Sequence, residues 1–189
     1  METEIIPETD APGENRQRNL PSDGELVLRT FQPGDEIAFH KLNEAWITRH
    51  FRLEEGDLQL LRDPRRHILD RGGEICLAVL GGHTVGCCAL MPIGPHEFEL
   101  VKMTVSEEVR GRGIGRRMLG FAIECGWRIG ARRLYLESNA TLPSALHLYE
   151  EAGFRHLPPA KRKPSKYQRA DVFMEMFLDP LSGKAQEKA

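Results

Sequence analysis

The chain has 189 residues and a formal net charge of −2, so it can bury the core of one domain but has no bulk charge to attract nucleic acid or an anionic membrane. Its four cysteines show no paired CxxC spacing, and its His, Cys and carboxylate positions show no zinc spacing, so we expect neither a disulfide framework nor a metal. No apolar run approaches the roughly 18 residues of a membrane span, and we expect a cytoplasmic protein.

The N-terminal segment is polar, proline-bearing and without a periodic apolar face, so 1–23 is expected to be a flexible arm. One domain is expected at 24–179, and 180–189 has the composition of a polar tail. In chain order the expected elements are a strand at 25–31, helices at 35–49 and 55–61, a short element at 63–70, strands at 75–80, 84–91 and 98–105, a helix at 114–129, a strand around 134–136, a helix ending near 152 and a closing strand at 170–177.

Turn residues set several of these boundaries. Gly81 and Gly82 predict a tight hairpin between the strands at 75–80 and 84–91. Pro92 is expected to end the second of these strands, because proline cannot donate to a strand ladder. We therefore expect an antiparallel meander that leads into the strand at 98–105.

Residues 110–117 read Arg-Gly-Arg-Gly-Ile-Gly-Arg-Arg, between a strand-like run and a helix-like run. A helix start carries roughly half a positive charge, so arginines there cost free energy unless an anion offsets them. Glycines at 111, 113 and 115 allow positive φ and let backbone N–H groups approach a ligand. We expect the loop to bind a phosphate group. The dinucleotide fingerprint would need glycine at 116, and a P-loop would need Gly-Lys-Ser/Thr, so neither fits.

The pattern Arg-x-x-Gly-x-Gly at 110–115, following the run at 99–105, resembles the pyrophosphate loop of the GNAT family, the acetyl-CoA-dependent N-acetyltransferases. The segments at 134–139 and 145–154 are similar to later segments of the same family, so three matches occur in order. The resemblance covers about 25–177. It implies an α/β (α+β) domain with a central mixed, mostly antiparallel, splayed sheet flanked by helices on both faces. The implied activity is acetyl transfer from acetyl-CoA to an amine by direct attack.

The resemblance also implies a binding site for acetyl-CoA. Loop amides would hold the pyrophosphate, and strand backbone would pair with the pantetheine arm. The residues expected to bind the cofactor are Met103, Thr104 and Val105 on the strand, Arg110, Gly111, Arg112, Gly113, Ile114, Gly115 and Arg116 in the loop, and Asn139 beyond the next strand. Asn139 is also a frequent turn former. Some members carry a second asparagine before the last helix, where this chain has Leu142-Pro143-Ser144, and that contact is in doubt.

Two residues are candidates for catalysis. Glu99 stands six residues before Val105, similar to the spacing of the general base in histone-acetylating members of the family. An ordinary glutamate, with a pKa of about 4.3, is a weak base for an ammonium group, so this role requires burial, a water relay or both. The alternative is a salt bridge of Glu99 with Lys102 or a neighbouring arginine. Tyr149 matches the family tyrosine that protonates the departing thiolate, and its alternative is a structural tyrosine.

The acceptor stays open between a small-molecule amine and an amine of a peptide or protein. A homodimer is possible, and neither a nucleic acid nor a membrane is expected as a partner. The alternative function is a noncatalytic acyl-CoA-binding regulatory module, because the phosphate site and the chemistry use different residues. Weaker or ambiguous site candidates are His96 and Glu97 as bases, Trp46, Phe51, Glu54 and Glu55 at the acceptor pocket, and Tyr167, Arg169 and Asp171 near the closing strand, whereas His147 is expected to be structural.

Overall fold

The computed structural model of the chain describes residues 24–178, and the expected arm at 1–23 and tail at 180–189 lie outside the described part. The strands are β1 (Leu26–Thr30), β2 (Glu74–Leu80), β3 (His83–Gly94), β4 (Glu97–Val105), β5 (Arg133–Ser138), β6 (Arg155–His156) and β7 (Val172–Phe177). The helices are α1 (Glu36–His50), α2 (Glu55–Arg62), α3 (Pro64–His67), α4 (Ile114–Arg128) and α5 (Pro143–Glu151), with the short 3-10 helices η1 (Leu69–Arg71), η2 (Glu107–Val109) and η3 (Pro159–Lys161).

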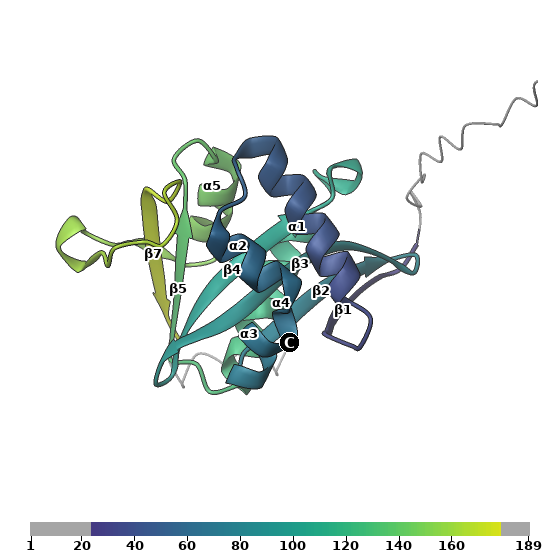
Figure 1. Cartoon of the computed structure of the whole chain (residues 1–189), viewed down its shortest axis with the longest axis horizontal. Helices are drawn as coiled ribbons and strands as arrows, with labels where there is room; N and C mark the ends of the chain where they lie inside the picture. Colours follow the sequence, from purple (N-terminus) through teal and green to yellow (C-terminus); the bar gives the residue numbers. More distant parts are fainter. Residues whose placement is uncertain (1–23, 179–189) are drawn as a thin grey trace, which may run out of the picture.

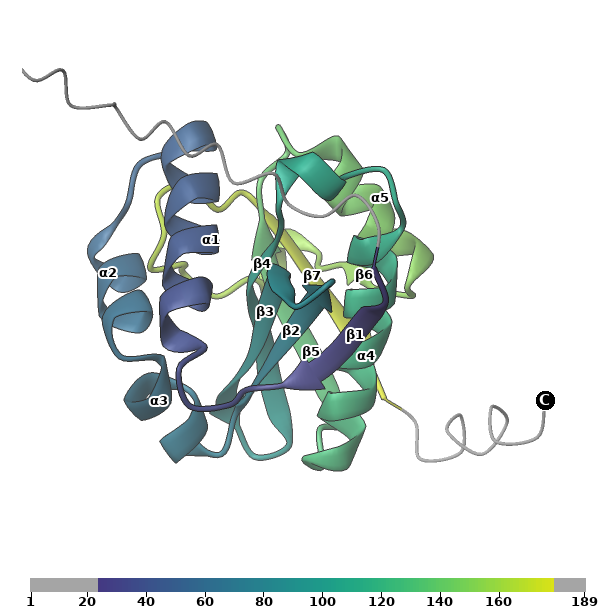
Figure 2. The ribbon, with the colours of Figure 1, turned by 90° about the vertical axis from the view of Figure 1, so that its right-hand side faces the viewer.

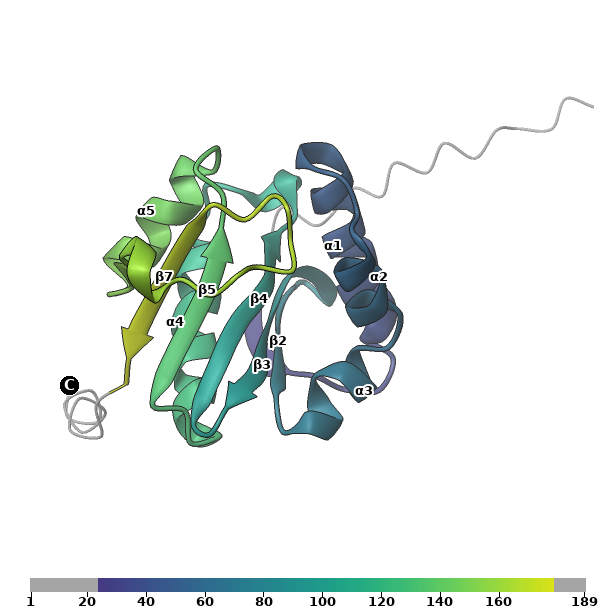
Figure 3. The same ribbon diagram turned by 60° about the vertical axis from the view of Figure 1, so that its left-hand side comes forward.

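The strands form one open sheet in the order β1-β2-β3-β4-β5-β7-β6 (Figure 1). Every pair of neighbours in this order is antiparallel except β4 and β5, which run parallel. The expected mixed, mostly antiparallel sheet is therefore confirmed. Helices cover both of its faces, with α1, α2 and α3 on one side and α4 and α5 on the other (Figures 2 and 3).

The alternation of side chains along β2 explains the two layers. Ile75 and Leu77 belong to the apolar cluster under α1, whereas Cys76 and Ala78 belong to the cluster under α4, and all four are fully buried. Successive residues of a strand project to opposite faces, so a continuous apolar run serves two cores. The sheet is thus the middle layer of the molecule.

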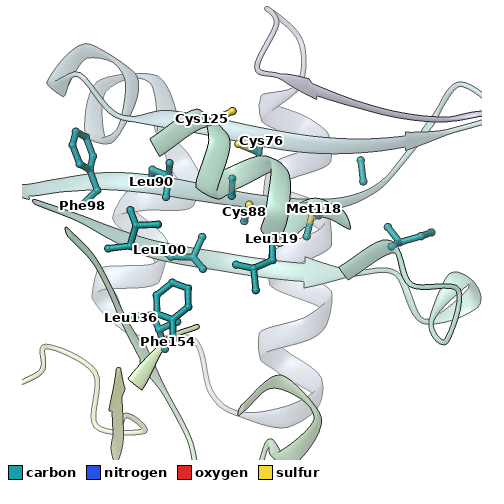
Figure 4. Packing of buried hydrophobic residues seen from close by; sticks show 14 of the residues in the cluster. Cys76, Cys88, Leu90, Phe98, Leu100, Met118, Leu119, Cys125, Leu136 and Phe154 are labelled. Atoms are coloured by element: carbon teal, nitrogen blue, oxygen red, sulfur yellow. The ribbon is translucent and has the colours of Figure 1, made fainter. Parts of the chain in front are cut away.

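Helix α4 fixes the position of the loop that precedes it. Its buried residues Ile114, Met118, Ala122 and Cys125 recur every three or four positions and form one face against β2, β3 and β4. Figure 4 shows Met118 and Cys125 of this face beside the sheet. Each fully buried aliphatic side chain contributes about 1.5–3 kcal/mol to stability, so the helix is held firmly. Its N-terminus consequently has a fixed place beside the end of β4.

Strand β3 corrects one prediction, because Pro92 does not end it. The strand continues to Gly94, and Pro92 pairs with Phe98 of β4. Strand β2 begins at Glu74, opposite Leu90, so the last part of β3 has β4 as its neighbour and no β2 on its other side. A proline is tolerated at such an edge, since its missing N–H leaves no partner unsatisfied there.

The sheet opens between β4 and β5. These strands pair only where 97–99 face 133–135, and beyond that point they separate. Between Val101 and Thr104, β4 carries one more residue than β3 opposite it, and Lys102 there takes a positive φ of 56°. Such a bulge bends its strand and increases the local twist, which is consistent with the divergence from β5.

Candidate active site

The glycine–arginine loop ends in a helix start without a side-chain cap. Gly111 and Gly113 adopt left-handed φ values of 78° and 73°, and Gly113 is the N-cap of α4. The first helical hydrogen bond runs from the N–H of Arg117 to the carbonyl of Gly113 at 3.1 Å, so among the described residues the N–H groups of 114–116 have no acceptor. The expectation that glycine at 115 would also allow a positive φ is not realised, because Gly115 lies within the helical first turn. Free N–H groups at a helix start, together with the helix dipole, suit the binding of an anion.

The arginines of the loop divide into two groups. Arg110 donates to Glu107 at 2.8 Å, and Arg116 forms an ion pair with a glutamate of α5. Arg112 and Arg117 are exposed and form no ion pair within the described part of the chain. These two side chains are therefore the ones whose charge is available to an anion in the loop.

A cleft with a volume of about 800 Å³, including its solvent-open part, lies where β4 and β5 separate. Its walls come from α1, β4, β5, α5 and the segment 167–170. The lining residues that bear on function are Trp46, Phe51, Glu99, Tyr149, Tyr167 and Arg169. The cleft unites both predicted catalytic residues with part of the predicted acceptor pocket.

Glu99 and Tyr149 reach this cleft from opposite faces of the sheet. Leu100 belongs to the core under α4, whereas its neighbour Val101 belongs to the core under α1. Strand alternation therefore places Glu99 on the α1 face. Tyr149 comes from α5 and packs against the core under α4. The cleft thus runs through the opening in the sheet rather than along one of its faces.

Glu99 is buried without a counter-ion. Its side chain is 7% exposed, and burial, followed by the negative charge of Glu137, raises its pKa from 4.5 to about 7, although Lys166 and Lys102 oppose the shift. The alternative of a salt bridge with Lys102 is wrong, because Lys102 is bound to Asp57. A carboxyl group with such a pKa can accept and release a proton near neutral pH.

The Tyr149 hydroxyl stays protonated near neutral pH. Its ring packs edge-on against Phe154, with centroids 6.0 Å apart. Burial, with a smaller contribution from Cys88, raises the pKa of Tyr149 above its ordinary value of 10. No described residue forms a hydrogen bond with this hydroxyl, although it lines the cleft. It therefore has a proton that it can donate into the cleft.

A buried ionic cluster borders the cleft where α2, β4 and the segment 167–170 meet. Asp57, which is 0% exposed, is bound to Lys102 and accepts two hydrogen bonds of 2.7 Å from Arg169. Arg169 also donates to Glu54 at 2.9 Å, and Lys102 donates to the Tyr167 hydroxyl at 3.3 Å. Burial alone would raise the pKa of Asp57, but Arg169 and Lys102 outweigh it and lower the pKa to about 2. The cluster ties α2 and β4 to 167–170.

Sequence reasoning missed Asp57 as part of this cluster and Glu137 as part of the cleft. Asp57 stands three residues after Glu54, and its side chain accepts from the Glu54 N–H at 3.0 Å. That spacing predicts only a helix cap, and the structure confirms the cap. It gives no indication that Asp57 also binds two side chains more than 40 residues away along the chain. Glu137 could have been found from its place two residues before Asn139 on an alternating strand.

Asn139 lies at the cleft with its side chain engaged in a turn. Its amide donates to the carbonyl of Arg169 at 2.6 Å, and its Oδ1 accepts from the N–H of Thr141 at 2.9 Å. The turn-forming interpretation is therefore satisfied. A contact with a cofactor arm stays a prediction, and it would have to share these hydrogen bonds or replace them.

Several of the weaker candidates lie outside the cleft lining. At the far end of β4, Glu97 pairs with Arg133 at 2.8 Å, and His96 hydrogen-bonds the Gly130 carbonyl at 2.8 Å. His147 is exposed, as expected for a structural histidine. The other three candidates outside the lining are Glu54, which accepts from Arg169, Glu55, which accepts from Gln59, and Asp171, which accepts from the Ala140 N–H. None of these is placed to act on a group bound near Glu99.

Two further observations concern residues 24–178. They contain no group of three or more His, Cys, Asp or Glu side chains that could hold a metal ion. Their helices lack the length and the apolar run that crossing a membrane would require.

Comparisons with known proteins point to one family. The Acetyltransferase (GNAT) family profile matches residues 36–154. The uncharacterized N-acetyltransferase YvbK of Bacillus subtilis (strain 168) is 31% identical over 102 residues, which are 52% of this chain and 66% of YvbK. The chain therefore spans slightly less than two thirds of that relative.

Solved structures share the fold. An acetyltransferase of the GNAT family from Staphylococcus aureus Mu50 superposes with a TM-score of 0.74 at 19% identity, over 82% of this chain and all of that one. The yncA acetyltransferase of Salmonella typhimurium, solved with acetyl-CoA, superposes with a TM-score of 0.64 at 18% identity, over 82% of this chain and 95% of that one. With the family profile, these findings establish that the chain belongs to the acetyltransferase (GNAT) family, which uses acetyl-CoA.

Proposed function

We propose that the protein transfers the acetyl group of acetyl-CoA to an amine bound in the cleft between β4 and β5. The observation that carries this proposal is that Glu99 and Tyr149 enter one cleft from the two faces of the sheet, at the point where the strands part. A proton acceptor on one side and a proton donor on the other are what an amine and a departing thiolate need. The relatives named as N-acetyltransferases do not favour the binding-only alternative.

The residues present fit acetyl-CoA. The N–H groups of 114–116 and the left-handed glycines before them suit a diphosphate, with Arg112 and Arg117 nearby. A Cβ on Gly115 would lie 3.6 Å from Leu148 of α5 and 3.9 Å from Val105 of β4, so this helix start lies close to both walls of the cleft. The edge of 103–105 that faces β5 pairs with no described strand, which leaves its backbone free for the pantetheine arm.

Acetyl-CoA supplies an acetyl thioester, so that overall an N–C bond forms and a C–S bond breaks. Glu99 is placed to take the proton that the amine loses, and Tyr149 to supply the proton that the sulfur gains. The rise in the pKa of Glu99 from 4.5 to about 7 makes proton removal from an ammonium group easier by about 3 kcal/mol. No cysteine lines the cleft, and burial raises the pKa of Cys87 to about 12, which supports direct transfer without an acyl-enzyme.

Location and assembly are part of the proposal. All four cysteines are buried free thiols, which suits a reducing compartment, and we place the protein in the cytoplasm. A homodimer is a prediction from the sequence alone, and light scattering of the purified chain tests it.

The function is tested by following thiol release from acetyl-CoA in the presence of primary amines. We expect amine-dependent thiol release. We also expect CoA to stabilise the folded protein by mass action, by about 2.7 kcal/mol at a CoA concentration of 100 times Kd, and so to raise its melting temperature. Stabilisation by CoA without thiol release across a broad amine panel would instead support the binding module. Absence of both effects would overturn the cofactor assignment.

A further inference from the structure

We propose that Glu137 binds the acceptor, and that the acceptor enters the cleft as an alkylammonium cation whose short alkyl chain carries no carboxylate. This deepens the proposed function and rests on it. The structure supports the inference in three steps, namely the placement of two carboxylates, the lack of ion pairs to them, and the prior engagement of the basic side chains that line the cleft.

The two carboxylates flank the opening in the sheet. Glu99 lies opposite Tyr135 in the last paired position of β4 and β5, and Glu137 follows two residues later on β5. Glu137 therefore projects to the same face as Tyr135, which is the face of Glu99. Both side chains line the cleft, one on each side of the gap.

Glu137 is oriented by neutral donors. The Tyr135 hydroxyl donates to its Oε1 at 3.0 Å, and the Ser165 hydroxyl donates to its Oε2. Within residues 24–178, no lysine, arginine or histidine forms an ion pair with Glu137 or with Glu99. Lys166 and Lys102 act on Glu99 from a distance, but neither forms an ion pair with it. Two acidic groups without an ion-pair partner form a site that suits a positive charge.

The cations that line the cleft are already paired. Lys102 and Arg169 are bound to Asp57, and Arg169 also to Glu54. An acceptor carboxylate would therefore find no unpaired cation among the residues that line the cleft and would face two acidic groups. Beyond the ionic cluster, the wall is aromatic, with the rings of Trp46 and Phe51 5.8 Å apart, which suits a cation on an aliphatic chain.

The pH dependence of activity gives an independent readout of Glu137. The groups that face Glu99 are Glu137 and Tyr135 on β5, Lys102 on β4, and Lys166 and Tyr167 in the segment that covers the cleft. Glu137 is among the causes of the raised pKa of Glu99. Replacing Glu137 by glutamine therefore lowers that pKa and moves the acid limb of the rate profile to lower pH. A merely structural change at position 137 would not move the limb in that direction.

The acceptor class is tested with three probes of equal chain length, n-butylamine, 1,4-diaminobutane and 4-aminobutyrate. We expect thiol release with the first two, and on the order of tenfold lower kcat/KM with 4-aminobutyrate, because one charge-assisted contact is worth about that factor. A lysine-containing peptide forms a fourth arm, which tells a protein amine from a free one. Equal kcat/KM for n-butylamine and 4-aminobutyrate would overturn the inference and leave acetyl transfer intact.

The residue is tested with Glu137→Gln and with the control Glu124→Gln, which removes the same charge from an exposed position on α4. We expect Glu137→Gln to raise KM for n-butylamine on the order of tenfold and to move the acid limb to lower pH, while the control changes neither. If Glu137→Gln does not fold, Ser165→Ala removes one of the two orienting donors and should raise KM in the same direction. Unchanged KM and an unmoved limb would refute the role of Glu137.

Failure of this inference can be told apart from failure of the proposed function. If no amine releases thiol, acetyl transfer itself fails, and calorimetric titration of the protein with n-butylamine then decides the role of Glu137. Binding that is lost in Glu137→Gln and kept in Glu124→Gln would support a cation site. Equal binding by the two variants would refute it.

Discussion

Replacing Glu99 by glutamine is expected to stabilise the protein at pH 8 while removing most of its activity. The buried carboxyl has a pKa of about 7 in the folded chain, against 4.5 for an ordinary glutamate. At pH 8 the folded chain must therefore ionise a group that the surroundings hold neutral, and this costs about 3 kcal/mol of unfolding free energy. Glutamine is similar in shape and has no charge to desolvate, so the folded variant does not pay this ionisation free energy and is more stable than the wild type at pH 8.

The sign of the pH dependence follows from the direction of the shift. A raised pKa means that the folded chain holds a proton that the unfolded chain has lost, so Glu99 favours the folded state at low pH. That advantage disappears as the pH rises from about 4.5 to about 7. The benefit of Glu99→Gln should therefore be about 1 kcal/mol or less at pH 5 and about 3 kcal/mol at pH 8.

Urea unfolding of the wild type and Glu99→Gln at pH 5 and pH 8 measures this difference, and Glu124→Gln serves as an exposed control for the loss of one charge. Thiol release from acetyl-CoA, measured in parallel, should fall steeply for Glu99→Gln and stay unchanged for the control. An equal effect of Glu99→Gln on stability at both pH values, or a loss of stability at pH 8, would refute the assigned burial and pKa of Glu99.

Three other substitutions have defined outcomes. Tyr149→Phe should lower kcat by roughly 10²–10⁴-fold and leave the stabilisation by CoA in a melting assay unchanged, since only the proton donor is lost. Gly113→Ala forces an alanine to a φ of 73° and should cost about 1–2 kcal/mol and weaken CoA binding, whereas the similarly strained Gly72→Ala, at a φ of 84°, should cost stability alone. Asp57→Asn leaves a buried lysine without its carboxylate and should cost about 3–5 kcal/mol in urea unfolding, against less than about 0.5 kcal/mol for the exposed Glu55→Gln.

The sequence predicted best where local chemistry decides the structure. The glycine and arginine pattern located both the loop and the start of α4, because only certain residues support left-handed backbone and a helix start without a side-chain cap. The layered fold could be predicted from the ordered motifs and from apolar runs long enough to serve two cores. Glu99 and Tyr149 could be named from the resemblance, and the structure brings them to one cleft.

Prediction failed where the outcome depends on distant partners. Whether Pro92 ends a strand depends on where β2 stops, which is set by pairing across the sheet. The two-residue strand β6 exists only through its pairing with β7 and carries no pattern of its own. The partner of Lys102 was sought on its own strand, but it lies on α2, 45 residues away. None of these facts follows from spacing along the chain.

A passage through the sheet has a consequence for how two substrates meet. The nucleotide and the amine would approach from opposite sides of the molecule, each by its own entrance, so neither has to leave before the other arrives. Under the proposed function, the ternary complex would then assemble in either order, and the two reactants would meet only at the gap between β4 and β5. The separation of two strands would thus give each substrate its own route of entry and one shared place of reaction.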